Sequence, residues 1–387
     1  MAWGCESSLS EQFASARACV TGMFPSLRRV GWTYQGFVKA MALWGAFVLN
    51  RLAGHLRLQM RLMTTCWTVD GIAAFAVDGS RIECPRTAAN ERELKCAGRK
   101  KTGPQLSLTT LYHMGSGCVW DYRIGPGIES ERTHLRQMIA SLPPEATIVA
   151  DAGFIGYDLL RDILTAGLHV LFRVGSNVTL LKKLGFAVVE GDSTVYLWPR
   201  QSQKKHHAPI VLRLMIAAGR HPVYMVSDVM DEETMSFEQA CVLYRLRWSI
   251  EVFYRSLKQT LGHRKMRSRA PDQAKMELNW AMAGLWVLSV RSAQEIVAVG
   301  KNPRGLSIAA ARKVVCQAMA GRCRARINLA RELGKALKDT YDRNTSKAAR
   351  NWPHKKTEQP PGAPKIQSAK PAQVQHAKEV QQNTIAA

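Results

Sequence analysis

The sequence predicts an α/β protein in which a mixed β-sheet is flanked by helices and interrupted by a β-rich insertion, with helical N- and C-terminal regions. Two observations predict this class. Residues 68–126 contain three strand-like runs, and residues 130–174 then alternate between helical and strand-like patterns. Three strands followed by alternating helices and strands form a mixed sheet with helices packed on it.

The first half of the chain supplies most of this pattern. In residues 1–68, "FVKAMALWGAFVLNRLAGHLRLQMRLM" places apolar side chains at three- and four-residue spacing, which predicts helices that either bind DNA or cap the core. The expected strands and helices then follow in order: strands 71–87, 105–114 and 117–126, helix 130–142, strand 144–151, helix 156–168 and strand 169–174.

The second half begins with a β-rich insertion over 176–221, which includes the hairpin-like "VVEGDSTVYLW" and the basic "PRQSQKKHH". The main sheet resumes at 222, so the predicted core comprises 69–175 and 222–300, followed by a helical region over 301–345. Residues 346–387 are rich in Lys, Pro, Gln and Ala and poor in large apolar residues, which predicts a disordered basic tail.

Charge and composition narrow the class of function. The chain has 387 residues, a net charge of +24 and a pI near 10.0. This charge favours a nucleic-acid partner over a small metabolite, although a generally basic composition is the alternative. Nine scattered cysteines without a C-x-x-C pair indicate a reducing compartment rather than a disulfide framework or a structural zinc site. Without an evident signal peptide or a membrane-length apolar run, we expect a cytoplasmic protein that does not bind membranes.

One basic stretch, "YRLRWSIEVFYRSLKQTLG" over 244–262, predicts a two-faced helix. Ser236 and Gln239 have capping-box spacing, and Gly262 is suited to end the helix. At about 100° per residue, one stripe is apolar; it comprises Leu246, Ile250, Phe253, Leu257 and Leu261. The opposite stripe is polar and comprises Tyr244, Arg247, Glu251, Arg255 and Lys258.

Glu251 is the one acidic residue of that stretch, and two interpretations fit it. Arg247 and Arg255 each lie four residues away, which is the spacing of a salt-bridged helix surface and is favoured on spacing alone. Alternatively, Glu251 is a metal ligand, and the surrounding cations hold phosphates. The second interpretation requires further carboxylates, because Mg²⁺ is bound by several oxygen ligands.

Asp78 and Asp151 are the candidate partner carboxylates. Asp78 follows "AFAV" at the expected end or turn of the first strand, and Asp151 follows "TIVA" at the expected carboxyl end of a buried strand. Ligands bind at the carboxyl ends of strands in open α/β sheets, although Asp after a strand is more often a turn residue. Asp70 competes with Asp78 but precedes the strand.

Together these residues resemble a known family. The spacing of Tyr244, Arg247, Glu251 and Lys258 matches the Tyr-Arg-Glu-Lys signature of DDE transposases encoded by bacterial insertion sequences, of the insertion-sequence-four type. "VDGS" at Asp78 and "ADAGF" at Asp151 are similar to that family's two aspartate motifs. The resemblance covers about 68–300 and implies an RNase H-like core interrupted by the β-rich insertion.

The resemblance also implies an activity, which is metal-dependent DNA cleavage and strand transfer of an insertion sequence. Asp78, Asp151 and Glu251 would bind two ions, Mg²⁺ or Mn²⁺, for in-line attack on a phosphodiester. The implied DNA-holding residues are Tyr244, Arg247 and Lys258, to which we add Arg255 from the same stripe and, outside it, Trp198.

Trp198 lies in the insertion, where some relatives stack a flipped base on an aromatic ring; packing within the insertion is the alternative. The implied partner is double-stranded DNA, both element ends and target, bound by a dimer in the nucleoid. Two other functions fit the same residues: an inactive, transposase-derived DNA-binding protein, and an RNase H-like nuclease without strand transfer.

Overall fold

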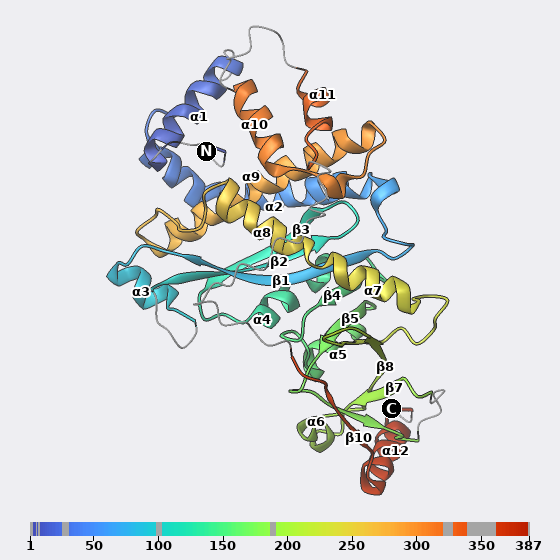
Figure 1. The fold of residues 1–387 in the computed structure, drawn as a ribbon. Coiled ribbons are helices and arrows are strands. Elements are labelled where there is room, and N and C mark those ends of the chain that lie inside the picture. Colours follow the sequence, from blue (N-terminus) through green and yellow to red (C-terminus); the bar gives the residue numbers. More distant parts are fainter. Residues whose placement is uncertain are drawn as a thin grey trace. The chain divides into compact units, whose positions relative to one another are not determined.

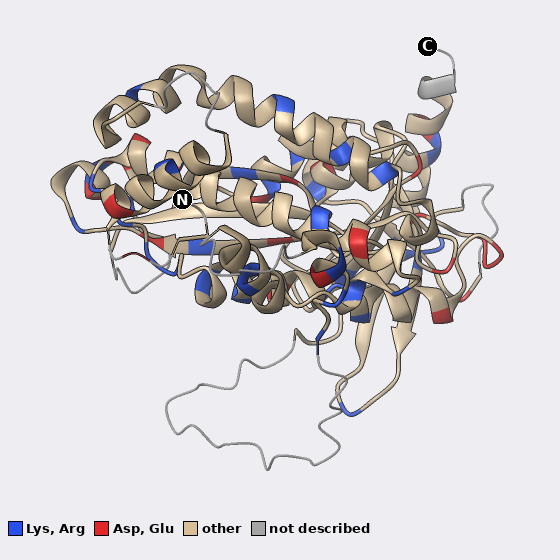
Figure 2. Cartoon of the chain, turned by 90° about the horizontal axis from the view of Figure 1, so that it is seen from above, with Lys and Arg blue, Asp and Glu red and all other residues tan. Residues whose placement is uncertain are grey.

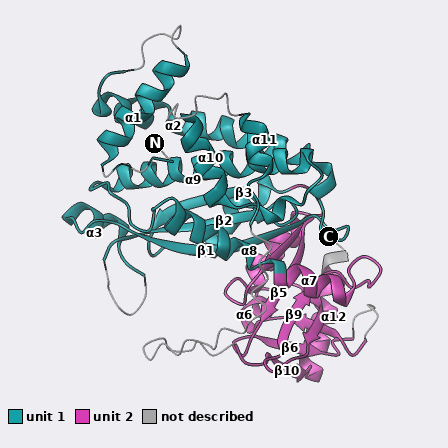
Figure 3. Cartoon of the chain, turned by 45° about the horizontal axis from the view of Figure 1, so that its top comes forward, with its two compact units in different colours: residues 1–142, 246–338 teal, residues 143–245, 339–387 magenta. Residues whose placement is uncertain are grey.

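The computed structural model describes residues 3–4, 6, 8–24, 31–97, 103–185, 191–319, 328–338 and 361–385. Two compact units share the chain. Unit 1 comprises 1–142 and 246–338, and unit 2 comprises 143–245 and 339–387 (Figure 3).

The elements alternate along the chain as follows. The helices are α1 (Leu9–Met23), α2 (Tyr34–Arg61), η1 (Thr64–Cys66), α3 (Ala88–Leu94), α4 (Glu131–Met138), η2 (Ile139–Ser141), α5 (Tyr157–Thr165), α6 (Arg200–Lys204), α7 (Phe237–Leu246), α8 (Ser249–Arg255), η3 (Ser256–Thr260), α9 (Pro271–Ala298), η4 (Pro303–Gly305), α10 (Ile308–Met319), α11 (Leu329–Gly334) and α12 (Pro371–Ile385). The strands are β1 (Ala74–Glu83), β2 (Gln105–His113), β3 (Cys118–Pro126), β4 (Thr147–Ala150), β5 (His169–Val174), β6 (Thr179–Lys182), β7 (Thr194–Leu197), β8 (Ile210–Ala217), β9 (Val223–Ser227) and β10 (Lys365–Ser368).

Unit 1 is built on an antiparallel sheet in the order β1-β2-β3. Helix α4 covers one face of this sheet, and α8 and α9 cover the other (Figure 1). Every residue of β2 after Gln105 is buried, which explains its nearly continuous run of apolar and small residues. The sheet therefore forms the middle layer of unit 1.

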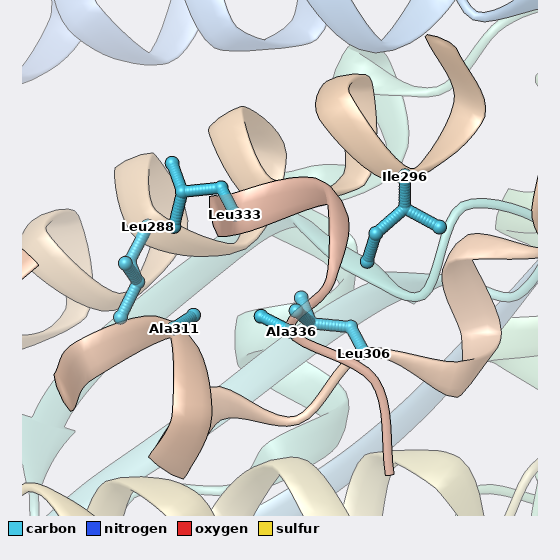
Figure 4. Close-up of a cluster of buried hydrophobic side chains, with 6 residues drawn as sticks. All are labelled: Leu288, Ile296, Leu306, Ala311, Leu333 and Ala336. Carbon is cyan, nitrogen blue, oxygen red and sulfur yellow. The ribbon is translucent and has the colours of Figure 1, made fainter. Parts of the chain in front are cut away.

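The C-terminal helices of unit 1 form a second apolar layer. Helix α9 carries fourteen buried residues, and α2 packs along it. Side chains from α9, α10 and the regions of η4 and α11 pack together in a buried hydrophobic cluster (Figure 4). The cluster contains Leu288, Ile296, Leu306, Ala311, Leu333 and Ala336. The long apolar pattern of 271–298 is explained by this packing, because α9 contacts other elements on several of its sides.

Unit 2 contains a mixed sheet in the order β10-β6-β7-β8-β9-β5-β4. Strands β4 and β5 are parallel to each other, and so are β6 and β10. The other neighbouring pairs are antiparallel: β5 with β9, β9 with β8, β8 with β7, and β7 with β6. The predicted insertion, 176–221, supplies β6, β7, α6 and β8. Because β8 pairs directly with β9, the insertion extends the sheet of unit 2.

The predicted mixed α/β class is confirmed, and the strands fall in the predicted order. The predicted core, 69–175 and 222–300, is divided between the two units, since unit 2 begins at Pro143 and unit 1 resumes at Leu246. Among the described residues, no helix combines the length and apolar character needed to cross a membrane.

The prediction of one continuous helix over 237–262 was wrong. Helix α7 ends at Leu246 and α8 begins at Ser249, because the N–H groups of Ile250 and Glu251 bond three residues back, to Arg247 and Trp248, at 3.1 Å. The helix then widens into a π-helix over Ser256–Thr260. Its predicted start is confirmed by both capping-box hydrogen bonds of Ser236 and Gln239.

The prediction of a disordered tail was wrong for 361–385, whereas 346–360 and 386–387 lie outside the described residues. Residues 365–368 form β10, which pairs with β6 from Lys365↔Thr179 to Ser368↔Lys182. Helix α12 follows and buries Ala377 and Val380. The composition of this segment cannot support a core of its own, but an edge strand supplies the missing hydrogen-bonding partners.

Candidate active site

In unit 1, the strand that carries Asp78 contacts α8, the helix that carries Glu251 and is called here the glutamate helix. Asp78 lies within β1, opposite Thr110 of β2, and not at the end of a strand as predicted. The hydroxyl of Tyr254 in α8 donates a hydrogen bond to the main-chain oxygen of Asp78 at 2.7 Å. Burial, and next the charge of Asp78, raise the pKa of Tyr254 well above its usual value, so this hydroxyl remains a donor. The first turn of α8, which contains Glu251, is thereby held on β1 near Asp78.

The "DGS" sequence has a steric role that a turn interpretation misses. Oδ1 of Asp78 accepts a hydrogen bond from the main-chain N–H of Gly79 at 2.8 Å. A Cβ at Gly79 would overlap the carboxylate of Glu131, which comes from the first turn of α4. Glycine therefore leaves room for the Glu131 side chain directly beside Asp78.

Glu251 is half-buried and forms the predicted ion pair with Arg247. Their closest atoms, Nη2 and Oε1, lie 3.7 Å apart, and the side chains are 9% exposed for Arg247 and 35% for Glu251. Sequence reasoning placed Arg247 on an open DNA-facing stripe, but the structure buries it beside Glu251. Arg255, by contrast, is exposed as predicted.

Lys258 lies on the π-helix, where its charge interacts with that of Asp78. Burial and then the nearby Arg264 lower the pKa of Lys258, whereas Glu83 and Asp78 act in the opposite direction. The apolar stripe predicted for this helix is buried at Ile250, Phe253, Leu257 and Leu261. A π-helical turn inside an α-helix is frequent at functional sites.

Unit 2 carries the remaining signature residues, Asp151 and Tyr244. Asp151 directly follows the buried strand β4, as predicted, and its Oδ1 accepts a hydrogen bond from the N–H of Gly153 at 2.8 Å. It is thus both a turn residue and a strand-end carboxylate. Tyr244 lies in α7 and is half-buried.

The donor set of the predicted site fits a hard divalent cation, because it consists of carboxylate oxygens. Unit 1 contributes Asp78 and Glu251, and unit 2 contributes Asp151. Over the described ranges, no three or more His, Cys, Asp or Glu side chains form a group that could hold a metal ion.

The structure does not support base stacking by Trp198. Its side chain is 3% exposed, and its Nε1 donates a hydrogen bond to the main-chain oxygen of His207 at 2.7 Å. The ring of His376 from α12 stacks on it, with centroids 5.6 Å apart and planes 16° apart. The packing alternative explains these contacts, because both the face and the polar edge of the indole are occupied.

Two residues of this region were missed by sequence reasoning, Tyr254 and Glu131. Tyr254 lies inside the quoted stretch, three residues after Glu251, but nothing in the periodicity distinguishes it from a core aromatic residue. Glu131 is far from every motif in sequence, and only the packing of α4 on β1 brings it to Gly79.

Comparison with known proteins adds a family to this geometry. The family model described as "Transposase DDE domain" matches residues 70–287, more than half of the chain. The chain belongs to this DDE transposase family. The match spans Asp78, Asp151 and Glu251, and members of the family use divalent metal ions.

The similar proteins include one curated transposase and one transposase of known structure. The transposase InsG of insertion sequence element IS4 from Escherichia coli strain K12 is 25% identical over 222 residues, which are 54% of this chain and 49% of that protein. The chain thus matches about half the length of this curated relative. A cryo-EM structure of the piggyBac transposase synaptic complex with hairpin DNA has a TM-score of 0.40 and 12% identity, and covers 73% of this chain and 60% of that chain.

Proposed function

We propose that this chain is a DNA transposase that cleaves DNA at the ends of an insertion sequence and joins those ends to target DNA. The proposal is carried by one observation: the Tyr254 hydrogen bond fixes the glutamate helix α8 on β1 at Asp78. It is further supported by membership of the DDE family over 70–287. In this proposal Asp78, Asp151 and Glu251 hold two divalent ions, Mg²⁺ or Mn²⁺.

When bound, two such metal ions would activate a water or a DNA 3′-hydroxyl and stabilise the leaving oxygen of an in-line displacement. The protein side chains provide orientation and charge. Arg247 holds one carboxylate oxygen of Glu251 and so limits its rotation. Lys258 places a cation near Asp78, where it would offset the charge of a DNA phosphate.

DNA contact is assigned to side chains that can reach phosphate. Arg255 is exposed and Lys258 is half-buried, and both lie on the helix that carries Glu251. The hydroxyl of Tyr244 is buried in this structure, so Tyr244 is not assigned a phosphate contact, and burial gives Arg247 the positioning role described above. Figure 2 shows Lys and Arg spread over many elements, in keeping with a net charge of +24 and with a duplex bound over a large surface. Two copies of the chain would hold the two element ends together.

The test uses the full-length protein, Mg²⁺ and a duplex that carries the ends of the element. Wild type is expected to cut and join this DNA, and Glu251→Gln is expected to bind it without cutting. Binding without cleavage by wild type would instead indicate an inactive DNA-binding protein, and cleavage without joining would indicate a nuclease. The matched control is Glu295→Gln, because Glu295 forms an equivalent ion pair with Arg291 four residues away on α9.

A further inference from the structure

A groove of about 1190 Å³ lies in unit 2 between the β-rich insertion and the C-terminal segment 361–385. We call it the C-terminal groove. One wall comes from the α6 region and includes Arg200, Lys204 and His206. The other comes from β10, α12 and the residues between them, and includes Lys365, Lys370 and His376. Neither the signature motifs nor the proposed catalytic residues lie in it.

The second wall is fixed by main-chain and ring contacts. Hydrogen bonds from Lys365 N to Val178 O and from Ala369 N to Lys182 O, both 2.9 Å, close the two ends of the β10–β6 ladder. In α12, Nε2 of His376 lies 2.9 Å from the main-chain oxygen of Gln203. The segment therefore has a defined position on the insertion, and its basic side chains face a groove of defined shape.

The charge of the groove has one sign. Arg200, Lys204, Lys365 and Lys370 are all exposed, and the residues that line the groove include no Asp or Glu. Within the described part of the chain, none of these four side chains forms an ion pair. Four cations around one concave surface repel each other and raise the local concentration of anions. An anion bound between the walls would relieve that repulsion.

We propose that the C-terminal groove binds the sugar–phosphate backbone of DNA, with segment 361–385 as one wall of the binding site. Cations on both walls suit a chain of phosphates, and lysines hold phosphates without reading base sequence. The identity of the polyanion rests on the proposed function, since a transposase has DNA as its substrate. The site takes the backbone and not a base, because Trp198 at its edge is already covered by His376.

Adjacent lysines provide a matched comparison. Lys204 lines the groove whereas Lys205 does not, and Lys365 and Lys370 line it whereas Lys378 of α12 does not. All five side chains are exposed. The test variant is Lys204→Gln/Lys365→Gln/Lys370→Gln, and the control variant is Lys205→Gln/Lys378→Gln.

Binding of full-length protein to labelled duplex and single-stranded DNA is measured without metal, at several salt concentrations. Each lost phosphate contact lowers the slope of log K against log salt by roughly 0.9 on duplex and 0.7 on single strands. The test variant is expected to lose roughly two to three contacts and to bind tenfold to a hundredfold more weakly near physiological salt, by the same relation. The control is expected to bind like wild type. Equal losses in both variants, or none in either, would overturn the proposal.

Lysine acetylation of wild type with and without DNA gives a second measurement that needs no variant. DNA is expected to protect Lys204, Lys365 and Lys370 and to leave Lys205 and Lys378 reactive; uniform protection or none contradicts the groove. These readouts are separate from catalysis. Normal DNA binding by the test variant would overturn the proposal that the C-terminal groove binds DNA. It would not affect the separate proposal that strand joining depends on Glu251. Failure of wild type to join DNA would remove the transposase proposal without affecting the binding result.

Discussion

The hydroxyl of Tyr254 and the main-chain oxygen of Asp78 lie 2.7 Å apart, which ties the glutamate helix to the strand that carries the first aspartate. Because Tyr254 is buried, a Tyr254→Phe change leaves that oxygen without its donor and is expected to cost about 1 kcal/mol of unfolding free energy. Strand-joining activity should fall further than this loss of stability alone explains, since α8, which carries Glu251, loses its hydrogen bond to β1.

The control for that prediction is Tyr122→Phe. The Tyr122 hydroxyl donates to the main-chain oxygen of Asn279 at 3.2 Å, also within unit 1 but outside the proposed site. Chemical denaturation and joining assays on both variants should show similar stability losses and a joining defect in Tyr254→Phe alone. An equal joining defect in both variants would reduce Tyr254 to a stability residue.

A side chain at Gly79 is expected to displace the Glu131 carboxylate from its place beside β1. A methyl group there would overlap the Glu131 carboxylate and force it away from Arg81, so Gly79→Ala should destabilise the protein by about 1 kcal/mol. Gly54→Ala, in open space on α2, should be neutral or stabilising. Thermal unfolding checks both, and Gly79→Ala/Glu131→Ala should recover most of the loss. A double variant as unstable as Gly79→Ala would exclude the overlap as the cause.

Arg247 and Arg255 are expected to behave differently although both are basic residues of the motif helix. Arg247→Gln removes the buried partner of Glu251 and should reduce joining and stability while DNA is still bound. Arg255→Gln changes an exposed side chain and should shift stability by less than about 0.5 kcal/mol while weakening DNA binding in a salt-dependent way. Denaturation and salt-dependent binding separate the two; the reverse pattern would show that Arg247 is the phosphate ligand.

The lowered pKa of Lys258 predicts the direction in which folding stability changes with pH. Burial lowers its pKa in the folded state, so the unfolded chain binds more protons between the folded pKa and 10.5. Stability contributed by this residue therefore rises with pH through that window, because the penalty of a buried charge disappears. Lys258→Gln should show a smaller rise than wild type in urea denaturation between pH 8 and pH 10. Parallel stability curves would show that Lys258 does not titrate in this window.

The same residue should respond to DNA. A bound phosphate favours the charged amine, so DNA binding should be accompanied by proton uptake at alkaline pH, measured by calorimetry in buffers of different ionisation enthalpy. Lys258→Gln should lose this uptake. Lys335→Gln is the control, because Lys335 pairs with Glu332 at 2.7 Å and is placed outside the site.

Local sequence signals predicted the parts of the fold that depend on near neighbours. The capping box of Ser236 and Gln239, the left-handed Gly262 and the buried stripe from Ile250 to Leu261 all appear as expected. Asp151 likewise follows a buried strand. These features arise from side-chain periodicity and from hydrogen bonds a few residues apart, which a single sequence displays directly.

Sequence alone therefore determined the α/β class, the order of strands β1 to β5 and the spacing of the signature residues. Tertiary structure decided the burial of Arg247, the closeness of Glu131 to Gly79, the covering of Trp198 by His376 and the folding of 361–385 onto β6. Each of these depends on an element distant in sequence or on the exact path of the helix after Leu246. Such contacts are set by which surfaces meet when the chain packs, and no local pattern encodes that choice.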